Sequence, residues 1–185
     1  MLLEERTLTR DVTGTIVPYG DQVVIEAGTT VSITHRLGGN FTVTWSGGMA
    51  QIRGIDAEAL GEEIPASAAI PTEKDGDHEG PPDEDAVWTA LRQVYDPEIP
   101  VNIVDLGLIY TMEVQSDEQA TAYDVRVDMT LTAPGCGMGP AIAQDAKMRV
   151  ETVPGVREAR VEIVWDPPWH QDMISEEGKM ELGLL

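Results

Sequence analysis

The chain has 185 residues, of which 42% are hydrophobic, enough to bury the core of one ordinary domain or of two small ones. Its formal net charge of −21 excludes nucleic acid and anionic membrane surfaces as favoured partners. The first residues lack a secretory signal pattern, no apolar run could span a bilayer, and the single cysteine cannot form an intrachain disulfide. We therefore expect a cytoplasmic protein whose partners are proteins or metal species.

The N-terminal part has the chemistry of β-strands. Four short runs rich in β-branched and aromatic residues alternate with turn signals rich in glycine, and they cover residues 15–17, 22–25, 30–34 and 41–45. This spacing predicts a small antiparallel β domain over residues 1–61, closed by a helical turn at 56–61.

The composition then changes. Between Glu62 and Asp85 there are nine acidic residues and one lysine, several prolines and glycines, and almost no large apolar side chain. Such a segment cannot recover its ordering entropy by burial. We expect residues 62–82 to form an acidic flexible linker, in which His78 is solvated.

Residues 83–185 alternate helix and strand patterns in the order αββαβ. The strands are expected at 108–114, at 122–131 and at a third segment in which Val161, Ile163 and Trp165 alternate with charged residues. One helix precedes the break at Pro97, and a second begins at about Pro140. The apolar stripes of the two helices are Val87, Leu91 and Val94, and Ile142, Ala146, Val150 and Val153. This order predicts an α+β domain, a small mixed sheet with helices on one face.

The strongest local feature is the segment 131–140, Leu-Thr-Ala-Pro-Gly-Cys-Gly-Met-Gly-Pro. It leads from a strand end through a glycine-rich loop to a helix N-terminus, where free N–H groups and a partial positive charge favour a thiolate. A thiolate is the form of cysteine that binds metal or attacks an electrophile. The alternative is a buried, inert structural cysteine, and the local sequence favours neither. The candidates here are Cys136 as ligand, with Thr132, Gly135 and Gly137 in support.

Two further segments carry polar groups between predicted elements. Residues 96–110 place three carboxylates, Asp96, Glu98 and Asp105, between a helix and a strand. They either cap turns, which is the default interpretation, or lie beside Cys136 as ligands or tuning groups. Residues 165–173 combine two prolines with Trp169 and His170, which is a possible metal ligand. Trp169 itself is expected to serve as a packing cover.

Familiar catalytic and cofactor motifs are missing from the chain, including paired Cys-x-x-Cys, a phosphate-binding loop, His-Glu-x-x-His and Gly-x-Ser-x-Gly. A stable iron–sulfur cluster normally needs four thiolates, and this chain has one. Any cluster must be shared between chains, completed by other ligands, or held briefly.

The three segments together resemble the SufT family of iron–sulfur assembly proteins, part of a wider family with eukaryotic cytosolic cluster-targeting factors and a phenylacetate-oxygenase accessory protein. The resemblance covers residues 83–185, and residues 37–43 and 56–61 also look like the β domain of SufT. It implies a role in cluster assembly or maturation, with Cys136 as the functional cysteine and Asp96, Glu98 and Asp105 as the acidic motif. Expected partners are a scaffold, client apoproteins and a second copy of the chain.

Three functions remain open at this point. The first, which is the hypothesis we adopt, is a transient cluster carrier or client adaptor that catalyses no reaction. The second is an enzyme that uses Cys136 as nucleophile or redox thiol, although no histidine stands in a motif that would make it a general base. The third is an interaction module in which the cysteine is incidental.

Overall fold

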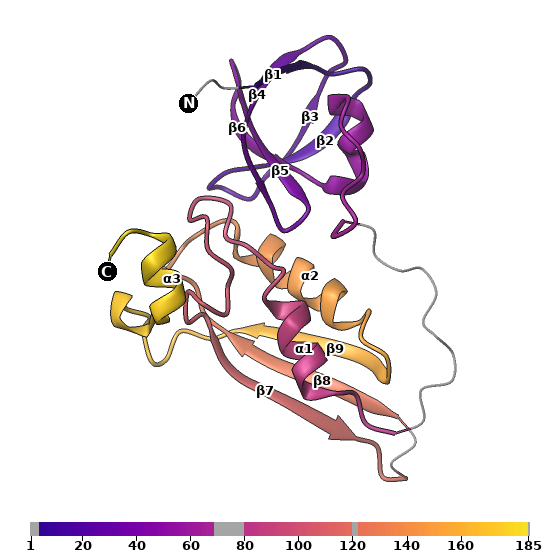
Figure 1. Ribbon diagram of the computed structural model, residues 1–185, viewed down its shortest axis with the longest axis vertical. Coiled ribbons are helices and arrows are strands. Elements are labelled where there is room, and N and C mark those ends of the chain that lie inside the picture. The colour runs from indigo at the N-terminus through magenta and orange to yellow at the C-terminus, as the bar shows by residue number, and fades with distance from the viewer. Residues whose placement is uncertain (1–3, 69–79, 120–121, 185) are drawn as a thin grey trace. The chain divides into compact units, whose positions relative to one another are not determined.

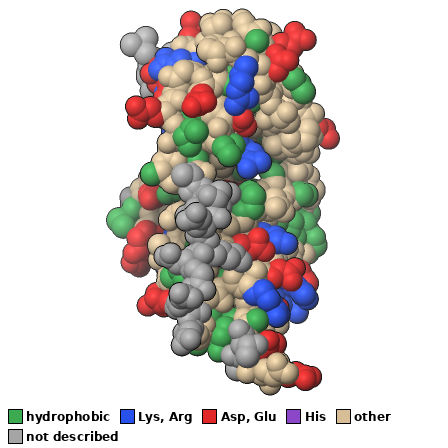
Figure 2. All heavy atoms as spheres, turned by 90° about the vertical axis from the view of Figure 1, so that its right-hand side faces the viewer, with side chains coloured by type: hydrophobic (Ala, Val, Ile, Leu, Met, Phe, Trp, Pro, Cys, Tyr) green, Lys and Arg blue, Asp and Glu red, His purple; other side chains and the backbone are tan. Residues whose placement is uncertain are grey.

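The computed structural model describes residues 4–68, 80–119 and 122–184. The chain divides into two compact units, the first formed by residues within 1–69 together with 97–100, and the second by residues within 70–96 and 101–185. Within the described residues, no helix is both long and apolar enough to cross a membrane. Acidic side chains lie interspersed with Lys and Arg on the face drawn in Figure 2.

The first unit is a six-stranded antiparallel sheet in the order β1-β4-β5-β6-β2-β3 (Figure 1). Its strands are β1 Glu4–Thr7, β2 Val12–Ile16, β3 Gln22–Ile25, β4 Thr30–Leu37, β5 Asn40–Trp45 and β6 Gly48–Ile52. Alternate strand residues such as Val31, Ile33, Phe41 and Val43 are buried in one core. The predicted all-β N-terminal domain is therefore confirmed. The sequence did not delimit β1 or β6, because β1 consists of charged and polar residues and β6 follows a glycine turn directly.

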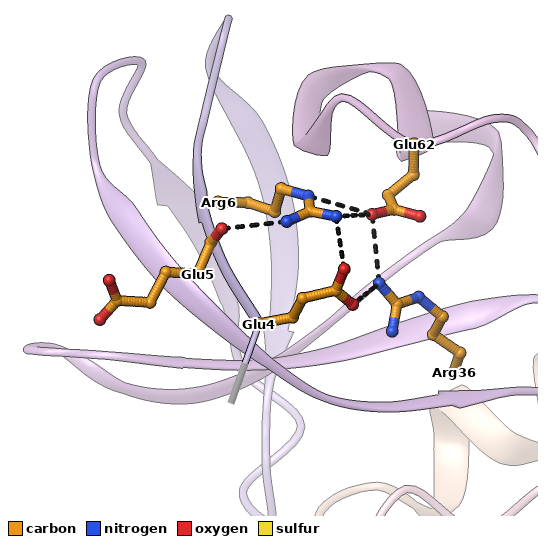
Figure 3. A network of polar contacts seen from close by, with 5 residues as sticks. All are labelled: Glu4, Glu5, Arg6, Arg36 and Glu62. Carbon is orange, nitrogen blue, oxygen red and sulfur yellow. Dashed lines mark hydrogen bonds and ion pairs between the residues drawn. The ribbon is translucent and has the colours of Figure 1, made fainter. Parts of the chain in front are cut away.

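The predicted helical turn is present as the 3-10 helix η1, Gly54–Leu60, which begins two residues earlier than expected. Beyond it, Glu62 accepts hydrogen bonds from Arg6 and Arg36, and both arginines also contact Glu4 (Figure 3). Bonds from Arg36 and Arg6 hold the pKa of the Glu4 carboxyl below its ordinary value. This network ties the residue that follows η1 to two strands, β1 and β4.

The residues just after Glu62 also pack on the first unit. The Cα of Gly39 lies so close to Ser67 that an added Cβ would stand 2.7 Å from the Ser67 hydroxyl. The described part of the first unit thus continues to residue 68, beyond the limit of 61 expected from composition. The rest of the expected linker, including His78, falls mainly on residues 69–79, which lie outside the described residues.

The second unit has the expected order αββαβ, followed by a short C-terminal helical segment. Its elements are α1 Glu84–Leu91, β7 Ile109–Ser116, β8 Tyr123–Met129, α2 Gly139–Val150, β9 Val156–Ile163, η2 Gln171–Met173 and α3 Glu176–Glu181. Strand β8 lies between β7, which is antiparallel to it, and β9, which is parallel. Helices α1 and α2 lie over one face of this mixed sheet (Figure 1). The predicted α+β class is confirmed.

The core of the second unit lies between the sheet and the helices. Val125, Val127 and Met129 of β8 are fully buried, as are Val87 and Leu91 of α1. The predicted stripe of α2 is buried along its length as well. The third strand differs from expectation. It ends at Ile163, and Trp165 lies beyond it with 47% of its surface exposed. The two prolines that follow Trp165 and Asp166 cannot donate to a strand ladder, which explains the early end.

Candidate functional site: the end of the small sheet

The three sequence segments meet at one end of the second sheet. Ile109 at the start of β7 is opposite Met129, the last residue of β8, and Met129 is paired with Ile163, the last residue of β9. Segment 96–108 leads into this end, and segments 130–138 and 164–173 leave it. Two backbone bonds join the segments, Thr130 N–H to Leu108 C=O at 2.8 Å and Val164 N–H to Met129 C=O at 2.7 Å. Strand pairing therefore brings together residues up to 77 positions apart, from 96 to 173.

The cysteine loop, residues 130–138, is held mainly by its backbone. Cys136 N–H lies 3.4 Å from the carbonyl oxygen of Ala133, and Gly139 N–H donates to Cys136 C=O at 3.2 Å. Gly135 has a φ of +84°, a conformation that glycine adopts without strain. Cys136 is half-buried and free, and it stands three residues before the first residue of α2. Cys136 therefore precedes the N-terminus of α2 closely in the chain, as the sequence predicted.

The start of α2 is pressed against the strand ends. A Cβ added to Gly139 would lie 2.5 Å from the Leu131 side chain and 3.2 Å from that of Ile163. No other residue type fits there without displacing its neighbours, so Gly139 fixes where the helix begins relative to β8 and β9. Thr132 and Gly137 are half-buried on either side of Cys136.

The acidic loop, residues 96–108, is bound by side chains. Asn102 accepts from the N–H groups of Val104 and Asp105, and its amide donates to the Asp105 carboxylate at 2.6 Å. The Ser175 hydroxyl donates to the other oxygen of that carboxylate at 2.9 Å, and Ser175 N–H donates to Asp105 C=O. Asp105 thus joins the acidic loop to the cap of α3. Asp96 is buried, with 4% exposed, and Glu98 is exposed.

The C-terminal segment, residues 164–175, is fastened across the same end. Trp169 Nε1 donates to Leu106 C=O at 2.8 Å, and the Tyr110 hydroxyl donates to Pro167 C=O at 2.7 Å. Gly107, with φ of +71°, lies so close that an added Cβ would overlap the carbonyl oxygen of Met173. Trp169 therefore holds the segment in place, in keeping with its expected packing role. His170 is exposed and lies 3.9 Å from Asp172.

Metal donors do not gather into an enclosed centre in the part of the chain that the structure describes. No three His, Cys, Asp or Glu side chains there are close enough together to hold a metal ion. Asp96, Glu98, Asp105 and His170 are consequently not assembled with Cys136 into such a group. A cluster bound at Cys136 needs ligands from outside these residues.

An open groove of about 670 Å³ lies beside the C-terminal segment. Its lining is mixed, with apolar side chains and two carboxylates, from Gly107, Ile109, Tyr110, Thr111, Asp128, Val164, Asp166, Pro167 and Met173. Sequence reasoning missed this groove, because it is built from three segments that only the sheet brings together.

Comparison with known proteins finds similarity to proteins of iron–sulfur cluster assembly and maturation. The family described as iron–sulfur cluster assembly protein matches residues 84–163. An Fe-S protein maturation auxiliary factor of Porphyromonas gingivalis is 47% identical over 102 residues, which cover 55% of this chain and 92% of that protein. The Fe-S protein maturation auxiliary factor SufT of Staphylococcus aureus is 43% identical over 91 residues, which cover 49% of this chain and 98% of that protein.

More distant similarities are found among carrier proteins and solved structures. An iron–sulfur cluster carrier protein of Synechocystis is 30% identical over 89 residues, 48% of this chain and 24% of that protein. A domain of unknown function from Bacillus anthracis, known from its crystal structure, is 39% identical in sequence. The match covers 55% of this chain and 92% of that domain's chain, with a TM-score of 0.47.

Proposed function

Because the chain belongs to the family of iron–sulfur protein maturation auxiliary factors, we propose that it holds an iron–sulfur cluster transiently at Cys136 and passes it to client apoproteins. The observation that carries this proposal is the meeting of three segments around the loop that contains the chain's only thiol. That thiol is partly accessible, lies near a helix N-terminus, and is flanked by glycines. These are the surroundings in which cysteine acts as a ligand.

One thiol per chain sets the form of the complex. Four thiolates hold a stable cluster, this chain has one, and no three His, Cys, Asp or Glu side chains of the described residues are close enough together to hold a metal ion. Two chains related by a two-fold axis would contribute a pair of thiolates, with the remaining positions filled by small-molecule or client thiols. A cluster held in this way is labile, which suits a protein that must release its cargo.

The same proposal fixes the surroundings in which the protein works. A lone thiol ligand must stay reduced, so we place the activity in the cytoplasm, among scaffold proteins and client apoproteins. The role is one of binding and transfer, and it requires no chemical catalysis by the chain. The net charge of −21 argues against nucleic acid as a partner.

A second function, that of a client adaptor without a cluster, is favoured by the groove beside the C-terminal segment. Its apolar lining and the exposed Trp165 next to it are features of protein-binding surfaces. An adaptor of this kind would bind clients equally well without the thiol.

The deciding experiment is anaerobic reconstitution of the full chain with iron and sulfide. We expect the wild type to gain an oxygen-sensitive visible chromophore that elutes with a dimer, and Cys136→Ala to gain none. A matched control combines Cys136→Ala with Ala133→Cys, which moves the thiol to an exposed position of the same loop. If the wild type and Cys136→Ala retain the same iron and sulfide, the carrier function is wrong and the adaptor function replaces it.

A further inference from the structure

One buried hydroxyl at the base of the cysteine loop has no hydrogen-bond partner in the described part of the chain. Thr130 is 1% exposed, and its Oγ1 is one of two buried side-chain polar atoms without a partner among the described residues. The other, Nδ1 of His35, belongs to a half-buried side chain of the first unit. Buried polar groups are nearly always paired, and an exception calls for an explanation.

The backbone N–H of Thr130 has a hydrogen-bond partner, so the unpaired group is the side-chain hydroxyl alone. The N–H donates to Leu108 C=O in the bond that joins the acidic loop to the cysteine loop. A valine has almost the same shape and would fill the position without leaving a polar group unpaired. A threonine therefore costs stability here unless its hydroxyl has a partner in another state of the protein.

The place of Thr130 indicates which state that is. It follows the last residue of β8 directly and precedes Cys136 by six positions, at the end of the sheet where the three segments meet. Its neighbour Leu131 packs against Gly139 at the start of α2, so both ends of the loop are anchored while residues 133–135 are exposed. Cargo bound at Cys136 would meet the loop at this exposed middle part.

We propose that Thr130 is a positioning residue for the cargo of Cys136, its hydroxyl donating a hydrogen bond to an anionic sulfur of the bound cluster. This inference rests on the proposed function. Cluster sulfides and thiolates accept such bonds, and each bond to sulfur stabilises the reduced state of the cluster and raises its reduction potential. The hydroxyl is unpaired in the empty protein because its acceptor arrives with the cargo.

The test compares Thr130→Val, which removes the hydroxyl and keeps the shape, with Thr130→Ser, which keeps the hydroxyl. Each full-length variant is reconstituted with iron and sulfide, and the loss of iron and sulfide during gel filtration is followed, together with the reduction potential of the cluster. We expect Thr130→Val to lose its cluster about tenfold faster than the wild type. The reduction potential of the cluster in Thr130→Val should also be lower than in the wild type. Thr130→Ser should restore both properties.

The stability of the empty protein separates this inference from a purely structural role. With no bond to lose, Thr130→Val without cargo should melt at the same temperature as the wild type or higher. A lower melting temperature would show that the hydroxyl is already bonded, for example to a buried water, and would overturn the inference. Wild-type cluster retention in Thr130→Val would also overturn it while leaving Cys136 as ligand. Equal iron in Cys136→Ala and the wild type would overturn this inference and the proposed function together.

Discussion

The cysteine loop and the acidic loop enter the same end of one sheet, yet they are built in opposite ways. The acidic loop is cross-linked by Asn102, Asp105 and Ser175 and covered by Trp169. The cysteine loop is exposed at residues 133–135, and within the described residues no side-chain hydrogen bond holds Thr132 or Cys136. The difference shows that side-chain hydrogen bonds brace one loop, whereas the other loop leaves its middle residues exposed beside a half-buried cysteine.

The sharpest test of this contrast uses two glycines with similar backbone conformations. Gly107 and Gly135 have φ of +71° and +84°, but a Cβ on Gly107 would overlap the Met173 backbone, whereas nothing lies within 4 Å of a Cβ on Gly135. Gly107→Ala should cost about 4 kcal/mol of unfolding free energy, from strain plus overpacking. Gly135→Ala should cost about 1 kcal/mol, from strain alone. Urea denaturation followed by tryptophan fluorescence measures both, and equal losses would contradict the contrast.

Removal of the Asp105 carboxylate should have the next largest effect. Asp105→Ala leaves the Asn102 amide and the Ser175 hydroxyl without their acceptor, and we expect a loss of about 3 kcal/mol. The matched control is Asp166→Ala, at an exposed carboxylate, which should change the unfolding free energy by about 0.5 kcal/mol or less. Variant protein that remains folded should still be reconstituted with a cluster. If it is stable but binds no iron, Asp105 acts as a ligand and not as a brace.

A smaller loss of stability is expected from a change at Trp169, which covers the acidic loop. Trp169→Phe keeps an aromatic ring but removes the 2.8 Å bond from Nε1 to Leu106 C=O. The predicted loss is about 1 kcal/mol, measured as a lower midpoint in differential scanning calorimetry. Trp165→Phe is the control, because Trp165 is an exposed large side chain. Equal midpoints for the two variants would mean that the bond contributes nothing to stability.

The smallest effect on stability should come from Cys136 itself. The side chain is half-buried and free, so Cys136→Ala should change the unfolding free energy by about 0.5 kcal/mol or less. The measurement is the same urea titration, on protein without iron. A loss as large as that of Asp105→Ala would make Cys136 a structural residue and would remove the distinction between the two loops.

Much of the fold could be predicted because its signals are local. The stripes Val87–Leu91 and Ile142–Ala146 have helical spacing, and Pro140 marks the start of α2, so both helices were predicted with nearly correct starts. Sequence analysis missed elements whose bounds depend on contacts with segments distant in the sequence. Strand β1 has no apolar alternation, because it is an edge strand that pairs with β4 on one side alone. The short α3 was missed as well: its N-cap Ser175 bonds to Asp105, 70 residues away, and no local pattern encodes that contact.

By itself, the sequence determined the α+β class and the family resemblance, and it named Cys136 as the candidate ligand, since periodicity, glycine spacing and residue chemistry are properties of the chain alone. Only the tertiary structure decided which polar groups are used for folding. It assigned Asp105 to a bond with Ser175, 70 residues away, and Trp169 to the carbonyl of Leu106, and it left the Thr130 hydroxyl buried without a partner among the described residues. The physical reason is that a hydrogen bond depends on distance in space, and the pairing of β7, β8 and β9 sets those distances.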